Sequence, residues 1–188
     1  LTNDDNIARR MQLLRSHGIT REPKEMPQRP DGLWHYQQVD LGFNYRMTDI
    51  QAALGLSQMQ RLDEFVTKRR CIAKRYDGLL ANIPAITPWQ HIGSYSSTHL
   101  YPIRLKLDEI SNTHGQIYNS LHTEGIQVNL HYIPVYRQPY YKNIGFNKGY
   151  CPEAEQYYQE AISLPMYPSL TEAQQERVVE TLRKVIGV

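Results

Sequence analysis

The sequence contains few residues that could fix its fold by covalent or metal links. Two cysteines occur among 188 residues, Cys71 and Cys151, and they lie far apart in the chain. Neither belongs to a Cys-x-x-Cys spacing, so the sequence indicates neither a redox motif nor a zinc site. A single disulfide between them is one alternative, but two free thiols in a cytosolic protein are the better expectation.

Long apolar runs and a strong excess of one charge are absent as well. No stretch is long enough to span a membrane, and the first residues do not resemble a signal peptide. The 21 basic and 19 acidic side chains give a net charge of +2, which predicts no strong attraction to nucleic acid or to an anionic membrane. We therefore expect a cytoplasmic protein without nucleic-acid or membrane partners. Hydrophobic residues make up 40% of the chain, which is enough for a packed core.

Most sequence signatures of catalysis are also missing. The chain has no glycine-rich phosphate loop and no Gly-x-Ser-x-Gly motif. Its seven histidines show no metal-ligand spacing, and His114 and His122, on one expected helix, are too distant to share an ion. We expect no metal site. The basic run over 68–75 lacks interleaved aromatic residues, so it indicates a solvated helix face and not a nucleic-acid site.

What the sequence does contain is a series of helices with clear start and stop signals. Thr2 or Asn3 is placed to cap a first helix that Gly18 would end. A capping box at Thr48 begins a long helix that runs towards residue 82, with a kink or break expected near residue 63. Another capping box, at Thr171, begins the last helix. Residues 20–40, rich in proline, predict a long exposed loop.

The middle of the chain alternates between strand and helix patterns. Apolar residues alternate over 101–107 and again over 126–130, which predicts two strands. A helix is expected between them over 111–124, and another over 152–162, where a proline occupies the first turn. This order predicts a small α/β domain, built on a strand–helix–strand crossover, next to a helical segment.

A candidate anion site lies directly before the long helix. Asn44 and Arg46 precede the capped start of that helix, where free backbone N–H groups attract anions. The two side chains would add a neutral donor and a charged donor to a phosphate. A second explanation is the commoner case for isolated residues of this type: Asn44 satisfies its own turn, and Arg46 pairs with a surface carboxylate.

A second candidate site follows the expected strand at 126–130. His131 and Tyr132 open a loop that is dense in tyrosines, and the whole chain has 14 tyrosines against 3 phenylalanines. Aromatic rings with a polar tip suit a wet, aromatic-lined ligand cleft. The alternative is that the tyrosines pack this loop onto the domain.

Four segments together resemble one family. Residues 42–55 (GFNYRMTDIQAALG) resemble the G-x-N-x-R-M-x-[DE]-x-x-A-A-x-G signature of the sugar-nucleotide aminotransferases, the DegT/StrS family. Residues 15–18 (RSHG), 131–141 (HYIPVYRQPYY) and 164–168 (LPMYP) resemble further elements of that family in the same order. Each segment is weak evidence alone, but together they are specific and cover nearly the whole chain. The 133–141 stretch looks most like the branch that makes the 4-amino altrosamine precursor of pseudaminic acid, with one departure at Tyr136, where relatives often carry histidine.

The resemblance implies a fold-type-I enzyme that uses pyridoxal phosphate (PLP) and works as a homodimer with active sites built from both subunits. It implies transfer of an amino group from glutamate to a 4-keto-6-deoxy nucleotide sugar, in pseudaminic acid or surface polysaccharide biosynthesis. Residues 1–83 would be the remainder of the large PLP-binding domain and the linking helix, and residues 84–188 the C-terminal small domain. By resemblance, Asn44 reaches the PLP phosphate of the partner subunit with Arg46 nearby, and His131 and Tyr132 border the sugar-nucleotide cleft.

The resemblance also implies that the catalytic machinery is incomplete. The chain begins at Leu1 without an initiator methionine, and its first residues (LTNDD) look like the sequence that follows the Schiff-base lysine in this family. We therefore expect a fragment that lacks this lysine, contains no catalytic residue and is inactive alone. Two alternatives stay open: a non-catalytic α/β binding or dimerisation module, and a lyase-type relative in which histidine replaces the lysine.

Overall fold

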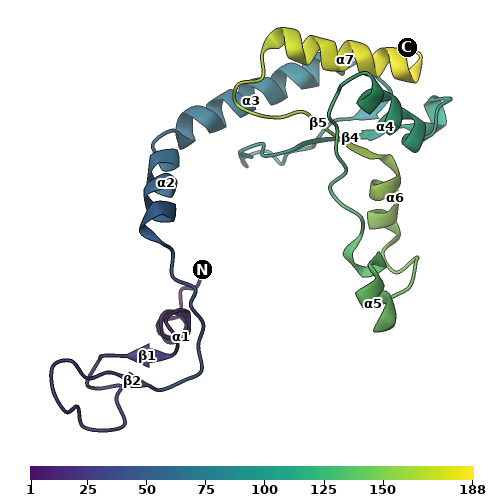
Figure 1. Ribbon diagram of the computed structural model, residues 1–188. Coiled ribbons are helices and arrows are strands. Elements are labelled where there is room, and N and C mark those ends of the chain that lie inside the picture. The colour runs from purple at the N-terminus through teal and green to yellow at the C-terminus, as the bar shows by residue number, and fades with distance from the viewer. The chain divides into compact units, whose positions relative to one another are not determined.

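The computed structural model describes residues 1–188, and the chain forms two compact units, residues 1–60 and 61–188 (Figure 1). Each unit is described by itself. The sequence analysis placed the division after residue 83, on family resemblance. In the structure, the helix that precedes residue 83 contributes core residues to the second unit, and the compact units divide at residue 60. The domain boundary implied by the family stays a prediction.

The first unit contains two helices and a short antiparallel strand pair. Helix α1 (Asp5–Arg15) begins after Asp4, whose carboxylate accepts hydrogen bonds from the N–H groups of Asn6 and Ile7. The cap is therefore Asp4, and the expectation of a cap at residue 2 or 3 was wrong. The Asp4 carboxylate accepts from two N–H groups of the first turn that have no partner within the helix. Helix α2 (Asp49–Met59) ends this unit.

The proline-rich segment 20–40 is anchored at both ends. Strands β1 (Ile19–Thr20) and β2 (Gln37–Gln38) pair antiparallel, so the expected loop is closed into a hairpin-like excursion. Glu25 accepts hydrogen bonds from Arg9 of α1 and from the hydroxyl of Thr20. The Arg9 guanidinium, followed by the Thr20 hydroxyl, lowers the pKa of Glu25 to about 2.

The predicted capping box at the start of α2 is confirmed. The N–H of Gln51 donates to Thr48 Oγ1 at 3.3 Å, and the N–H of Thr48 donates to Gln51 Oε1 at 3.0 Å. The expected break in the long helix is also confirmed: α2 ends at Met59, and α3 (Leu62–Leu79) begins three residues later.

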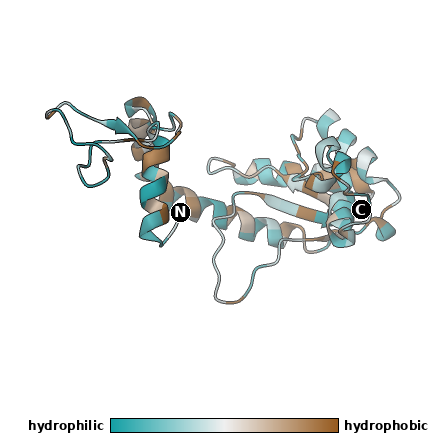
Figure 2. Cartoon of the chain, turned by 90° about the horizontal axis from the view of Figure 1, so that it is seen from below, coloured by the Kyte–Doolittle hydropathy of each residue, from teal (hydrophilic) through white to brown (hydrophobic).

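The first unit has no hydrophobic core of its own. No residue of α1 or α2 is buried, although apolar residues, brown in Figure 2, recur along the helices. Ile50 is 82% exposed, and Leu54, Leu56 and Met59 of the same helix are exposed to a similar degree. Exposure of this much apolar surface to water is unfavourable in free energy. Such a surface is typical of one that packs against another part of a protein.

The second unit is built on a three-stranded antiparallel sheet. The strands are β3 (Ala85–Ile86), β4 (Tyr101–Leu105) and β5 (Ala161–Leu164), in the order β3-β4-β5. Besides α3, its other elements are η1 (Leu107–Glu109), α4 (His114–Thr123), η2 (Val135–Arg137), α5 (Pro139–Asn143), α6 (Pro152–Glu160) and α7 (Glu172–Ile186). Residues of β4, β5, α3, α4 and α7 form one core. The capping box predicted at Thr171 is confirmed at the start of α7.

Two sequence expectations for this unit were wrong. Residues 126–130 do not form a regular strand, because only Asn129 pairs with the sheet, through a bridge to Ser163. Conversely, the end of the helix expected over 152–162 is strand β5, which is buried along its whole length and so lacks the alternation of a half-exposed strand. The three regular strands therefore pair antiparallel. The segment at Asn129, which α4 connects to β4, meets the other side of β5 through this single antiparallel bridge, so the expected crossover ends in a bridge and not in a strand.

Several polar groups are satisfied inside this unit. The hydroxyl of Tyr76 donates to the carbonyl of Pro165 at 3.1 Å, and burial raises the pKa of that phenol. The side chain of Gln175, on α7, donates to the carbonyl of Ile72, on α3, at 3.0 Å. These bonds connect α3 to the segment after β5 and to the first turn of α7. Polar groups left unpaired at such depth would be destabilising. Cys71 and Cys151 are free and exposed.

None of the helices is both long enough and apolar enough to cross a lipid bilayer.

Only the second unit has a hydrophobic core, and this difference predicts which unit proteases cleave first. We expect limited proteolysis to cleave within residues 1–60 before it cleaves the second unit, because segments without buried apolar contacts open locally at low free-energy cost. Mass spectrometry of a trypsin time course should show a resistant fragment that begins near residue 61. Early cleavage in α7 or β4 would contradict the assignment of the stable core to the second unit.

Candidate functional site

Two of the sequence motifs are parts of one structure. Residues 43–45 run beside the end of α1: the N–H of Phe43 donates to the carbonyl of Leu14 at 2.7 Å, and the N–H of Tyr45 donates to that of Arg15 at 3.0 Å. In return, the N–H of His17 donates to the carbonyl of Phe43 at 2.8 Å. The R-S-H-G element and the segment that carries Asn44 are thereby held together by backbone hydrogen bonds.

This close approach requires glycine at two positions. Gly18 has a φ of +70°, and a Cβ there would lie 1.8 Å from the carbonyl oxygen of Asp40. A Cβ at Gly42 would lie 2.3 Å from the backbone nitrogen of Gly18. Since no side chain fits at either contact, the two glycines allow the two motifs to meet.

Asn44 and Arg46 are exposed, and neither side chain has a hydrogen-bond or salt-bridge partner within the chain. The commoner explanation, in which Asn44 satisfies its own turn and Arg46 pairs with a carboxylate, is therefore not what the structure shows. An amide N–H and a guanidinium are both suitable donors to phosphate oxygens. Asp49, in the first turn of α2, opposes anion binding at the helix end itself. The Asn44 amide and the Arg46 guanidinium, and not the helix end, are therefore the groups suited to bind a phosphate.

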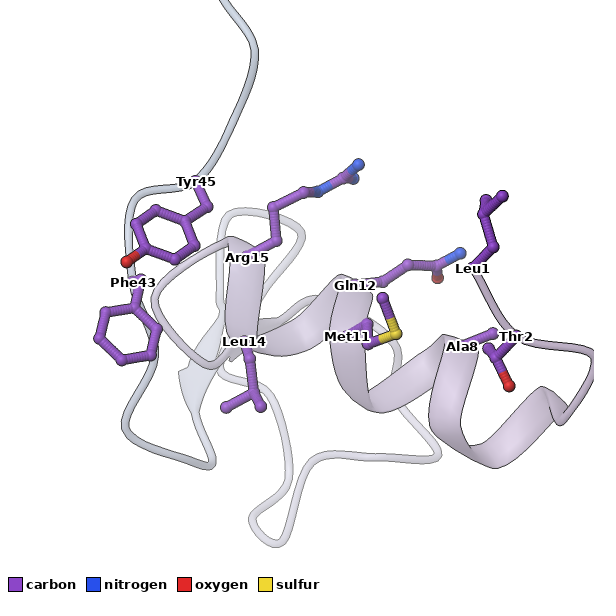
Figure 3. Close-up of a pocket in the computed structure, with 9 residues that line it drawn as sticks. All are labelled: Leu1, Thr2, Ala8, Met11, Gln12, Leu14, Arg15, Phe43 and Tyr45. Atoms are coloured by element: carbon purple, nitrogen blue, oxygen red, sulfur yellow. The ribbon is translucent and has the colours of Figure 1, made fainter. Parts of the chain in front are cut away.

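An open apolar groove lies beside this segment, within the first unit. Its volume is about 580 Å³, and its lining includes Met11 and Leu14 of α1 together with Phe43 and Tyr45 (Figure 3). The rings of Phe43 and Tyr45 stack with their centroids 5.0 Å apart. The lining has few polar groups that converge on one point, so the groove is better suited to packing than to orienting a polar ligand.

His131 and Tyr132 follow the bridge at Asn129 in the second unit. His131 is half-buried, and its Nδ1 lies 2.8 Å from the Oγ of Ser163. Tyr132 is 70% exposed, and its ring meets that of His131 edge to face, with centroids 4.7 Å apart. The structure thus places Asn44 and Arg46 in the first unit and His131 and Tyr132 in the second.

The tyrosine-rich loop is partly packed on itself. Tyr136 and Phe146 both contact the ring of Tyr150, with centroid separations of 5.7 and 5.0 Å. This agrees with the alternative in which tyrosines pack the loop. Tyr132 and Tyr140 nevertheless keep their rings largely exposed, so aromatic surface is still available for a ligand.

A buried carboxylate that the sequence analysis missed anchors this loop. Glu155 of α6 is 8% exposed and accepts hydrogen bonds from the Tyr136 hydroxyl at 2.6 Å and the Gly149 N–H at 2.7 Å. The bond from Tyr136, followed by that from Gly149, lowers the pKa of Glu155. Glutamates in first helical turns are usually solvated, and the sequence offers no signal for these partners, which are 19 and 6 residues away.

The pKa shift of Glu155 predicts a pH-dependent contribution to stability. Since its folded-state pKa lies below its ordinary value of 4.5, the carboxylate stabilises the fold above about pH 4.5 and loses this effect as the pH falls through the folded-state pKa. We expect Glu155→Gln to lower the Tm at pH 7 and to approach the wild-type Tm at acidic pH, where both side chains are neutral. Differential scanning fluorimetry across pH measures this.

Glu153→Gln is the matched control, because Glu153 lies in the same helical turn but is exposed and has no polar partner. This variant should melt like the wild type at both pH values. Equal effects of the two substitutions at pH 7 would contradict the anchoring role of Glu155.

A sequence profile of the DegT/DnrJ/EryC1/StrS aminotransferase family matches residues 1–183. The chain belongs to this family of aminotransferases, which confirms the resemblance carried by the four sequence segments. Curated relatives include the spore coat polysaccharide biosynthesis protein SpsC of Bacillus subtilis, 33% identical over 98% of this chain and 48% of SpsC. Another is a UDP-4-amino-4,6-dideoxy-N-acetyl-beta-L-altrosamine transaminase of Helicobacter pylori, 31% identical over 98% of this chain and 46% of the relative. The chain thus spans about half the length of the curated relatives it matches.

Solved structures show the same relationship. PseC of Helicobacter pylori, an aminotransferase of pseudaminic acid biosynthesis, superposes with a TM-score of 0.86 and 29% identity over 99% of this chain and 47% of PseC. The putative sugar aminotransferase Spr1654 of Streptococcus pneumoniae superposes in its PMP form with a TM-score of 0.85 and 30% identity, over 99% of this chain and 46% of that protein. A PLP form of Spr1654 matches as well. The expected fold class is confirmed by these neighbours.

Proposed function

We propose that this chain is part of a PLP-dependent aminotransferase that transfers an amino group from glutamate to a 4-keto-6-deoxy nucleotide sugar. The proposal is carried by the family match over residues 1–183, which includes a signature segment whose Asn44 and Arg46 side chains have no partner within the chain. The altrosamine transaminase among the relatives and the PseC structure support a sugar substrate. The PLP and PMP forms of Spr1654 support the cofactor.

In the proposed enzyme, Asn44 and Arg46 hold the phosphate of PLP. The amide N–H of Asn44 donates to a phosphate oxygen, and the guanidinium of Arg46 adds a charged donor nearby. Following the family resemblance, the phosphate belongs to the cofactor of the partner subunit of a homodimer. When bound, PLP supplies the electron sink that amino-group transfer requires.

None of the seven lysines of this chain is assigned to the cofactor. Three of them pair with carboxylates at the surface, Lys68 with Glu64, Lys106 with Glu109 and Lys184 with Glu124. The other four, Lys24, Lys74, Lys142 and Lys148, are exposed. Because a lysine that bonds to PLP needs a shielded site and a perturbed environment, these positions favour ordinary surface roles for all seven. The proposal therefore assigns the catalytic lysine to the other half of the enzyme.

The sugar nucleotide is proposed to lie against His131 and Tyr132. The exposed ring of Tyr132 provides a flat apolar face with a polar tip, and the His131 ring provides a further polar group next to it. The Glu155 anchor holds the loop that begins with these residues onto α6.

Removal of the phosphate donors should weaken cofactor binding. In the complete enzyme, Asn44→Ala and Arg46→Ala should each raise the Kd for PLP by at least about tenfold, since a hydrogen bond to a charged group contributes about 1.5–3 kcal/mol and about 1.4 kcal/mol is a factor of ten. Equilibrium titration of the apoenzyme, followed by PLP absorbance, measures this. Arg29→Ala is the matched control, because Arg29 is exposed and has no ion pair. An unchanged Kd in both site variants would remove these residues from the cofactor site.

The proposed reaction has a direct test in two half-reactions. Glutamate should convert the PLP form of the complete enzyme to its PMP form, and a 4-keto-6-deoxy nucleotide sugar should convert it back and yield the amino sugar. Absorbance and mass spectrometry of the product follow the two steps. The 188-residue chain alone should retain no pyridoxyl group after borohydride reduction. A complete protein that neither binds PLP nor responds to glutamate would leave the non-catalytic binding module as the explanation.

A further inference from the structure

The side chain of Ser163 has one partner, and that partner is His131. Ser163 lies on β5 and is 5% exposed. Its backbone exchanges two hydrogen bonds with Asn129, and on the other side it lies opposite Pro102 of β4. Its hydroxyl makes a single hydrogen bond, to the Nδ1 of His131 at 2.8 Å. A buried serine hydroxyl that points to one imidazole nitrogen determines where the imidazole proton resides.

The direction of this hydrogen bond follows from the burial of the hydroxyl. If Nδ1–H donated to Oγ, the hydroxyl hydrogen of Ser163 would have no acceptor, because Nδ1 is the one hydrogen-bond partner of this hydroxyl in the structure. An unsatisfied buried donor costs about 1–3 kcal/mol. Donation from Oγ–H to Nδ1 satisfies both atoms, and it requires the neutral imidazole to carry its proton on Nε2.

The second imidazole nitrogen of His131, Nε2, is then a hydrogen-bond donor. Its Nε2 has no partner within the chain, and the half-buried ring is also held edge to face against Tyr132. We propose that Ser163 is a positioning residue that holds His131 as an Nε2–H donor for an oxygen acceptor of the bound nucleotide sugar, such as a diphosphate oxygen. This inference rests on the proposed function of His131 at the substrate cleft.

Two other histidines provide an internal reference. The Nε2 of His114 lies 2.9 Å from the carbonyl oxygen of Ala161, and the Nε2 of His122 lies 2.9 Å from that of Val128. Since a carbonyl can only accept, both rings carry a proton on Nε2 for reasons independent of Ser163. A change at Ser163 should therefore alter His131 and leave these two rings unaffected.

The first measurement is the tautomeric state of His131, by ¹⁵N NMR of the imidazole nitrogens in the 188-residue chain, well above the ordinary His pKa of about 6.5. We expect a single Nε2–H tautomer in the wild type. In Ser163→Ala, the Nδ1 resonance of His131 should shift and a second tautomer should appear, while His114 and His122 stay unchanged. A wild-type Nδ1–H tautomer, or identical His131 resonances in the variant, would overturn the proposal.

Two further variants separate hydrogen bonding from packing. Ser163→Cys keeps a side chain of similar shape but has only a weak S–H donor, so its His131 resonances should follow those of Ser163→Ala. Ser169→Ala is the matched control, because Ser169 is exposed and has no hydrogen-bond partner. If the cysteine variant behaves like the wild type, Ser163 acts through its volume, and the donor assignment is wrong.

The second measurement is steady-state kinetics of the complete, PLP-loaded enzyme. We expect Ser163→Ala to raise the KM for the nucleotide sugar about fivefold, the effect of one hydrogen bond, with kcat and the KM for glutamate retained. An altered tautomer with an unchanged KM would overturn the role of His131 as a substrate donor. The NMR result does not depend on activity, so a failure of the proposed function and a failure of this inference give different outcomes.

Discussion

Strand β5 pairs with β4 over four residue pairs, and its Ser163 also pairs with Asn129 on the opposite side. All four of its residues are buried. This burial leaves its polar groups dependent on partners within the chain, because water cannot replace them. The hydroxyl of Ser163 and the carbonyl of Ala161 find those partners in two histidines. One candidate substrate-binding residue, His131, is thereby attached directly to strand β5.

The first unit positions its candidate residues by a different means. It has no hydrophobic core, so Asn44 and Arg46 depend on the backbone hydrogen bonds between residues 43–45 and the end of α1. The contacts at Gly18 and Gly42 make this junction tight. Local hydrogen bonds of this kind hold a segment in place, while the apolar side chains around them stay exposed until another surface covers them.

Sequence reasoning was accurate where the physical signal is local and failed where it is not. The capping boxes at Thr48 and Thr171 depend on residues three positions apart, and both were predicted correctly. Strand β5 was missed because a fully buried strand loses its alternation and resembles a helix end. Glu155 was missed because its partners come from two other segments. The four family segments were read from the chain directly, but only the fold shows that two of them are in contact.

By itself, the sequence determined the capped starts of α2 and α7, the break between α2 and α3, and the family, because each of these depends on short runs of adjacent residues. The tertiary structure decided that the sheet is antiparallel, that the Glu155 carboxylate lies under a loop, and that Ser163 lies against His131. Ser163 and His131 are 32 residues apart, and no pattern in the chain links them. Their contact exists because the burial of β5 brings the segment after Asn129 alongside it, and burial is a property of the whole fold.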